Sequence, residues 1–150
     1  MIRIVFCCHG NICRSPMAEY IMKELVRREG RSGEFLIDSC AVSTEELGNG
    51  VYPPARAELE RRGIPCGRHS AVQLTRSDYD RYDLFIVMDR SNLRRARSIL
   101  GGDSEGKLRM LMTYAGEERD VSDPWYSRRF DVAFDDIYEG CEGLLRALKD

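Results

Sequence analysis

A cysteine and an arginine separated by five residues, Cys8 and Arg14, stand between a mostly apolar run at residues 2–7 and a segment that starts a helix at Pro16. The apolar run predicts a buried strand, and proline suits the first helical position. A tight loop in this setting directs backbone N–H groups and the positive end of the helix toward one point. The sequence therefore predicts an anion cradle with a reactive cysteine at its floor.

The residue types inside the loop fit such a cradle. The planar guanidinium of Arg14 can bond two oxygens of one phosphate group. Gly10 permits close backbone approach, and Asn11 tolerates the left-handed conformation. Ser15 is expected to cap the following helix, and its hydroxyl lies close enough in sequence to bond the Cys8 thiolate. The remaining residues of the cradle are His9, Ile12 and Cys13.

Length and charge limit the other possibilities. A chain of 150 residues, 43% hydrophobic and 32% charged, is typical of one globular domain, predicted here as 1–150. A net charge of −2 gives no electrostatic case for binding nucleic acid. No apolar stretch approaches the roughly 18 residues of a membrane span, and Arg3 interrupts the short apolar start. We therefore expect a cytoplasmic protein that does not bind membranes.

The cysteines do not form a pattern typical of disulfides or zinc. A secreted disulfide framework is usually short and follows a leader sequence, and this chain has neither property. Structural zinc needs a second pair of ligands, which the sequence lacks. We expect no metal and no cofactor, with Cys7 and Cys141 as small core residues. The six cysteines are at positions 7, 8, 13, 40, 66 and 141.

Strand-like and helix-like segments alternate along the chain, which predicts an α/β fold with a parallel sheet and helices on both faces. Ligands bind such sheets at the carboxyl ends of the strands, where the cradle also lies. Residues 44–54 form the least regular segment and predict a loop beside the site. The predicted strands are 2–7, 34–38, 84–88 and 107–112, with a short extended segment at 69–72, and the predicted helices are 17–28, 54–62, 91–100 and 130–148.

A second group is needed if Cys8 attacks a phosphate ester. The reaction expels an alkoxide or phenoxide, and this leaving group needs a proton. Asp123 is the clearest candidate acid, because Pro124 fixes the backbone after it and two aromatic residues, Trp125 and Tyr126, follow to flank a phenyl ring. An Asp-Pro pair alone is typical of a turn, and Asp120 is a nearby alternative.

With these residues in place, the chain resembles the low-molecular-weight protein tyrosine phosphatases. The matching motifs occur in the order typical of the family and span nearly all 150 residues. They are Cys8-x-Gly-Asn-Ile-Cys-Arg-Ser-Pro16, Asp38-Ser39 with Ala41-Val42-Ser43, His69 with Ala71 and Gln73, Met88-Asp89 with Ser91-Asn92, and Asp123-Pro124 followed by two aromatic residues.

The resemblance implies a flavodoxin-like three-layer sandwich with a four-stranded parallel sheet. It also implies metal-independent hydrolysis of phosphotyrosine through a phosphocysteine intermediate, inhibited by phosphate and other oxyanions in the loop. Cys8 is then the nucleophile, Arg14 the clamp on the transition state, and Asp123 the general acid and later the general base. The residues expected to brace the loop are Asn11, Ser39 and His69, while Ser15 tunes the thiolate.

Two departures from the family pattern concern substrate preference. Many members have an aromatic residue in the pocket wall where this chain has Glu45, and tyrosine commonly occupies the position of Trp125. Glu45, Glu46 and Asp123 also gather negative charge at the expected mouth, while Tyr126 completes the aromatic side. Acidic phosphopeptides are therefore expected to be disfavoured.

Three alternative functions share parts of this pattern. Arginine phosphatases share the cradle but typically have threonine at the position where this chain has Ile12. The Ile12 side chain suits a phenyl ring and so favours phosphotyrosine, whereas the Glu45 carboxylate can attract a guanidinium and so favours phosphoarginine. Thioredoxin-coupled arsenate reductases need further cysteines at about residues 76–92, and this segment has none. A non-catalytic anion-binding or redox-sensing module is expected to lose Cys8, Arg14 or the Asp123 acid, and all three are present.

Overall fold

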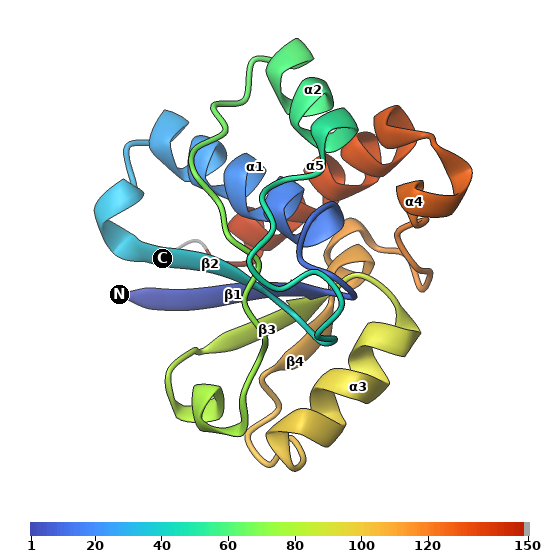
Figure 1. Ribbon diagram of the computed structural model, residues 1–150. Helices are drawn as coiled ribbons and strands as arrows, with labels where there is room; N and C mark the ends of the chain where they lie inside the picture. Colours follow the sequence, from blue (N-terminus) through green and yellow to red (C-terminus); the bar gives the residue numbers. More distant parts are fainter. Residues whose placement is uncertain (149–150) are drawn as a thin grey trace.

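Four parallel strands form one sheet in the computed structural model, which describes residues 1–148. The strand order is β2-β1-β3-β4, so the first strand lies in the middle (Figure 1). The predicted four-stranded parallel sheet is therefore confirmed. The strands are β1 (Ile2–Cys8), β2 (Phe35–Ala41), β3 (Leu84–Val87) and β4 (Leu108–Met110).

Helices cover both faces of this sheet, which confirms the three-layer α/β sandwich (Figure 1). Three helices pack on one face, and α3 lies on the other with a 3₁₀ turn, η2 (Arg76–Asp80). The helices are α1 (Arg14–Arg28), α2 (Pro53–Arg61) and α5 (Phe130–Ala147) on the first face, α3 (Arg90–Leu100) on the second, and the single turn α4 (Pro124–Ser127) beside the carboxyl ends of the strands.

The central strand is buried on both sides, as its apolar run predicts. Ile4 and Phe6 belong to the core under α1 and α5, whereas Val5 and Cys7 belong to the core under α3. This alternation follows from the two-residue period of a strand. Because of this alternation, Cys8, the last residue of β1, points to the face of the sheet that α1 covers. Cys7 and Cys141 are fully buried core residues, as expected.

The start of α1 differs from the prediction. The helix begins at Arg14, so Ser15 lies in its first turn and Pro16 is its third residue. Cys13 occupies the capping position without a side-chain capping bond. The prediction that Ser15 caps the helix is therefore wrong, and the reason is that its hydroxyl is already occupied in the bonds to Cys8 and Asn11.

Two predicted strands also need correction. Residues 107–112 yield only the three residues of β4, because the chain then turns into η3 (Leu111–Ala115) under α5. The short segment 69–72, expected to be extended, does not join the sheet, and the neighbouring Gln73 makes an isolated bridge to Ala41. β2 extends to Ala41, beyond the predicted end at residue 38, because it pairs in register with β1 up to Cys8. One further 3₁₀ turn, η1 (Ser32–Glu34), precedes β2.

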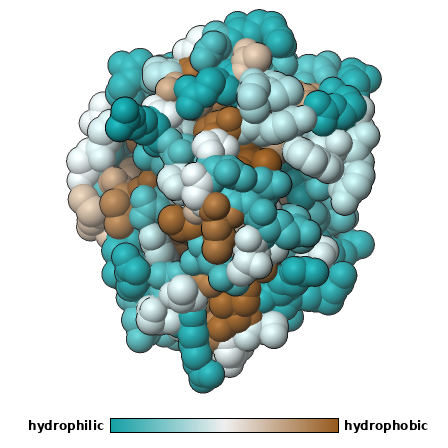
Figure 2. Space-filling model, viewed as in Figure 1, coloured by the Kyte–Doolittle hydropathy of each residue, from teal (hydrophilic) through white to brown (hydrophobic). Residues whose placement is uncertain are grey.

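The face shown in Figure 2 carries separate hydrophobic groups among hydrophilic residues. Among residues 1–148, none of the helices combines the length and apolar character needed to cross a bilayer.

The contact between α5 and η3 yields a test of this packing. We expect Gly143→Ala to destabilise the protein by about 1–3 kcal/mol, the usual cost of overpacking. A Cβ at residue 143 would meet the backbone of Tyr114, whose carbonyl carbon would lie only 2.6 Å away. Alanine normally stabilises a helix relative to glycine, so a destabilisation identifies the steric clash. Urea unfolding measures the effect.

Gly33→Ala is the matched control, because a Cβ at Gly33 has nothing within 4 Å. It should leave the free energy of unfolding nearly unchanged. A Gly143→Ala protein as stable as the parent would contradict the close approach of α5 to η3.

Candidate active site

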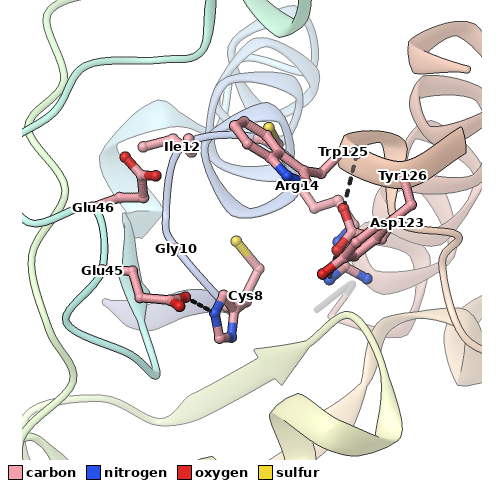
Figure 3. Close-up of a pocket in the computed structure, with 11 residues that line it drawn as sticks. Cys8, Gly10, Ile12, Arg14, Glu45, Glu46, Asp123, Trp125 and Tyr126 are labelled. Carbon is pink, nitrogen blue, oxygen red and sulfur yellow. Dashed lines mark hydrogen bonds and ion pairs between the residues drawn. The ribbon is translucent and has the colours of Figure 1, made fainter. Parts of the chain in front are cut away.

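A cavity of about 260 Å³ lies at the carboxyl end of β1, where the sequence places the cradle. Figure 3 shows the Cys8 sulfur directed into it, with Glu45 and Glu46 on one side and Asp123 on the other. The lining residues are Cys8, His9, Gly10, Ile12, Cys13, Arg14, Glu45, Glu46, Asp123, Trp125 and Tyr126.

Cys8 is 3% exposed and meets the first turn of α1. Its Sγ lies 3.0 Å from the hydroxyl of Ser15 and accepts a 3.4 Å hydrogen bond from the Ser15 backbone N–H. The Ser15 hydroxyl accepts a bond from Asn11, so its own proton remains available for the sulfur or, at 3.4 Å, for the Cys40 carbonyl. This position suits a sulfur that carries negative charge.

Asn11 gives the loop its curvature. It is fully buried in the left-handed conformation, with φ of 60°. Its amide donates to the hydroxyls of Ser15 (2.8 Å) and Ser39 (2.9 Å), and its side-chain oxygen accepts from the Val72 N–H at 3.2 Å. The backbone carbonyl of Asn11 accepts a 2.6 Å bond from Nε2 of His69. The structure therefore brings all three predicted bracing residues together.

Glu19 extends this network beneath the loop. The hydroxyl of Ser39 donates to Oε1 of Glu19 at 2.6 Å, and Lys23 donates to Oε2 at 2.6 Å. Glu19 lies on α1 and is buried. Sequence reasoning assigned no role to it, because its contact with β2 joins positions 20 residues apart.

Backbone bonds hold the outer side of the cradle. The carbonyl of Cys8 accepts from the Val42 N–H at 3.0 Å, and the carbonyl of His9 accepts from both the N–H and the hydroxyl of Ser43. The carbonyl of Ile12 accepts from the Tyr52 N–H at 2.8 Å. The loop carbonyls are thus turned outward, away from the cavity side of the loop.

Arg14 is 3% exposed and lies among acceptors. Its Nη1 lies 2.9 Å from the Asp89 carboxylate and donates to the Val121 carbonyl at 2.9 Å, while Nη2 lies 3.5 Å from Oδ2 of Asp123. Burial lowers the pKa of Arg14, but the negative charges of Cys8, Asp123 and Asp89 outweigh burial and hold its pKa above the usual value. The guanidinium stays charged.

Asp89, which the sequence analysis noted only as part of a family motif, is the main site residue to which it assigned no role. It directly follows Met88 at the end of the predicted strand and accepts from the Asn92 N–H at 2.7 Å as the N-cap of α3. β3 neighbours β1 in the sheet, so an acidic residue just after it lies close to the cradle. An aspartate between a strand and a helix was the available signal.

Asp123 lies at the rim of the cavity, on the side opposite Glu45 and Glu46, and its carboxylate is near the Arg14 guanidinium. It is the N-cap of α4, where its Oδ1 accepts from the Trp125 N–H at 3.0 Å, and its side chain is 31% exposed. Tyr126 is 83% exposed and Trp125 is half-exposed at the mouth. Asp120, the alternative acid, lies outside the cavity lining and accepts from the Arg90 N–H at 3.1 Å.

The cavity wall that faces Asp123 is acidic. Glu45 lies at the rim (Figure 3) and pairs with Nε2 of His9, and both side chains are exposed. Glu46 lies so close to Gly10 that a Cβ there would come within 3.1 Å of its Cγ, so a larger residue at position 10 would require the Glu46 side chain to shift. The predicted cluster of Glu45, Glu46 and Asp123 therefore surrounds one opening.

Cys13 behaves as a neutral thiol. Burial, with smaller contributions from the charges of Cys8 and Asp123, raises its pKa to about 12. Within residues 1–148, no three His, Cys, Asp or Glu side chains are grouped to hold a metal ion.

Comparison with known proteins identifies the family. The sequence model described as low molecular weight phosphotyrosine protein phosphatase matches residues 3–150. The chain belongs to this family. Low molecular weight phosphotyrosine protein phosphatases are hydrolases of phosphoric monoesters, so the chain is an enzyme of that class.

Individual members of the family are similar along their whole length. The chain is 34% identical over 151 residues to the low molecular weight protein-tyrosine-phosphatase YfkJ of Bacillus subtilis, covering 99% of this chain and 97% of that protein. It is 34% identical to the Homo sapiens phosphatase over 147 residues, 96% of this chain and 91% of that one.

Solved structures of the same fold agree. The crystal structure of YfkJ matches with a TM-score of 0.95 at 35% identity, covering 99% of this chain and 94% of that one. The crystal structure of DARP, described as a Drosophila arginine phosphatase, matches with a TM-score of 0.89 at 26% identity, covering 100% and 99%.

The Asn11 network predicts separate effects of backbone and side chain in this phosphatase. We expect Asn11→Ala to destabilise the fold by about 1–3 kcal/mol, because buried partners lose their bonds and alanine is strained at positive φ. Asn11→Gly relieves the strain but not the lost bonds, so its loss should be smaller. Urea unfolding measures both. We also expect inorganic phosphate to raise the melting temperature of the parent, and both variants to lose this stabilisation.

Asn49→Ala is the control, because among residues 1–148 its side-chain amide bonds the Glu46 carboxylate and none of the groups that Asn11 bonds. It should bind phosphate like the parent. Phosphate binding that survives in both Asn11 variants would show that the network does not shape the cradle.

Proposed function

We propose that residues 1–150 act as one phosphatase domain that hydrolyses phosphotyrosine through a phosphocysteine intermediate, without a metal. The observation that carries this proposal is the convergence of three groups on one cavity: the Cys8 sulfur, the buried Arg14 guanidinium and the Asp123 carboxylate. A nucleophile, a fixed positive charge and a proton donor are what in-line displacement at phosphorus requires.

In the first step, the Cys8 thiolate attacks phosphorus and the bond from phosphorus to the phenolic oxygen breaks. The protonated Asp123 carboxyl transfers its proton to that oxygen, so tyrosine leaves as a neutral phenol. Arg14 and the N–H groups of the cradle bond the phosphoryl oxygens. Asp89 helps to hold the Arg14 guanidinium, from 2.9 Å away.

In the second step, water attacks the phosphocysteine. The Asp123 carboxylate takes one proton from the water, the sulfur–phosphorus bond breaks, and inorganic phosphate forms. The Ser15 hydroxyl and N–H lie beside the sulfur, so they favour its departure as a thiolate. Because the product is itself an oxyanion that fits the cradle, inorganic phosphate should inhibit.

We also place the enzyme in the cytoplasm. All six cysteines are free, and the proposed reaction needs Cys8 reduced. A reducing compartment maintains both conditions.

The role of Asp123 leads to a prediction about leaving groups. Asp123→Asn should lower kcat/KM for a phosphotyrosine peptide by roughly 10²–10⁴-fold, the range typical of general acid–base catalysis. The loss should be much smaller for a nitrophenyl phosphate, because its more acidic phenol leaves without a proton. Steady-state kinetics with both substrates measures the difference.

Asp120→Asn is the internal control and should cost far less, because Asp120 lies outside the cavity lining. Equal losses with both substrates would mean that Asp123 shapes the loop without delivering a proton. A larger effect at Asp120 would move the acid there.

A second candidate substrate is phosphoarginine. It is favoured by the two glutamates of the wall, which can pair with a guanidinium, and by the similarity to the Drosophila arginine phosphatase. Ile12 and the exposed aromatic pair favour the phenyl ring of phosphotyrosine instead. Parallel assays of phosphotyrosine and phosphoarginine peptides of one sequence separate the two functions.

The wall residue predicts how these substrates respond to mutation. Glu45→Tyr should raise kcat/KM for aryl phosphates by adding ring contact and removing a negative charge, and should relieve the discrimination against acidic phosphopeptides. Glu34→Gln, an exposed charge change outside the cavity lining, is the control and should change neither. The wall assignment fails if acidic peptides are already the best substrates and Glu45→Tyr changes nothing.

A further inference from the structure

The loop that carries Asp123 is packed against a residue from another part of the chain. The ring of Trp125, two residues after Asp123, lies with its centroid 4.8 Å from that of Tyr52 at an angle of 50°. Tyr52 directly precedes α2, at the end of the loop that carries Glu45. Tyr52 itself does not line the catalytic cavity, whereas its partner Trp125 does.

Arg128 closes the same contact from the other end of α4. Its guanidinium lies 5.4 Å from the ring centre of Tyr52 and 5.3 Å from that of Phe130, and Nη2 donates to the Tyr52 hydroxyl at 3.1 Å. Nη1 lies 3.5 Å from the Trp125 carbonyl. Arg128 is also one of two non-glycine residues with positive φ within residues 1–148, at 60°.

The backbone of α4 depends on this arrangement. The Arg128 N–H donates to the Pro124 carbonyl at 2.9 Å and so ends the turn that Asp123 begins as N-cap. A helix of one turn is not stable on its own, because nucleation costs more than its few hydrogen bonds return. The packing of Trp125 and Arg128 on Tyr52 therefore supplies stability that the turn lacks.

Tyr52 is in turn fixed to the cradle. Its N–H donates to the Ile12 carbonyl at 2.8 Å, and its carbonyl accepts from Ala55 and Arg56 in the first turn of α2. Ile12 lies in the loop between Cys8 and Arg14. One residue thus contacts both the loop that holds the nucleophile and the turn that presents the acid.

We propose that Tyr52 and Arg128 are positioning residues that hold Asp123 in place for proton transfer. The inference rests on the proposed function, in which Asp123 is the general acid. Because Tyr52 and Arg128 act through the α4 turn and lie outside the cavity lining, their loss should impair proton delivery while phosphate binding is preserved. A misplacement of about 1 Å is enough to impair a reaction that depends on orientation.

The experiment compares the parent with Tyr52→Ala, Tyr52→Phe and Arg128→Gly. Tyr52→Ala should lower kcat/KM for the phosphotyrosine peptide by roughly tenfold or more, and for nitrophenyl phosphate by less than about threefold, as expected of a group that acts only through the acid. Tyr52→Phe keeps the ring on Trp125 and loses the bond to Arg128, so its loss should be smaller. The inhibition constant of inorganic phosphate should stay unchanged in all three.

Arg128→Gly separates position from backbone strain. Glycine adopts φ of 60° without cost, so the turn is relieved of strain while the guanidinium is removed. A selective loss with the phosphotyrosine peptide supports the proposal. Parent-like activity in both Arg128→Gly and Tyr52→Phe would overturn it, even if Tyr52→Ala failed to fold.

The decisive measurement repeats the substitutions in the Asp123→Asn background. A positioning residue has nothing left to position there, so Tyr52→Ala and Arg128→Gly should each add less than about twofold to the loss. Full additivity, or equal losses with both substrates, would overturn the proposal. If Asp123→Asn itself shows no dependence on the leaving group, the proposed acid fails, whereas a dependence at Asp123 that is absent at Tyr52 and Arg128 removes only this inference.

Discussion

The arrangement of the site depends on the burial of one amide side chain. Asn11 bonds two hydroxyls and a backbone N–H inside the protein, and its own backbone takes a conformation that favours glycine. Buried polar groups that lose their partners are costly, so the surrounding network fixes the backbone in this conformation. The curvature turns the loop around the space above Cys8, and the Ser15 hydroxyl joins the network to the sulfur. Structural bracing and the proposed activation of the Cys8 nucleophile thus use the same atoms.

The parallel sheet explains how distant residues meet at this loop. Because β1 is central, the segments that follow β2 and β3 end beside it, and they supply the acidic wall and Asp89 respectively. The chain returns after β4 to bring Asp123 to the rim, and the Val121 N–H donates to the Met88 carbonyl at 2.9 Å on the way. The cavity is therefore built from several crossover connections at one end of the sheet, as expected for open α/β folds.

Local sequence predicted the parts of the site that are encoded locally. The spacing of Cys8 and Arg14, the nature of Asn11 and the alternation of strands and helices were enough to place the cradle, because each depends on neighbours within a few residues. The predicted start of α1 was wrong because the Ser15 hydroxyl bonds Cys8 and Asn11 instead of capping the helix. The roles of Asp89 and Glu19 were not predicted because their partners lie in other elements of the fold. The role of Tyr52 was not predicted because it bonds Arg128, which lies 76 positions further along the chain. Pairings of this kind follow from packing, which a local pattern does not contain.

The charges around Arg14 stabilise the folded site before any anion binds. A buried guanidinium without partners would be strongly destabilising, and here Asp89 and the Val121 carbonyl satisfy one nitrogen while Asp123 stands 3.5 Å from the other. The shorter contact belongs to the residue that fixes Arg14, and the longer one to the residue proposed to move a proton. In the proposed reaction, a phosphate dianion entering the cradle would compete with Asp123 for Nη2 and leave the bond to Asp89 in place. The difference between these two carboxylates lets one arginine be held firmly on one side and remain available to substrate on the other.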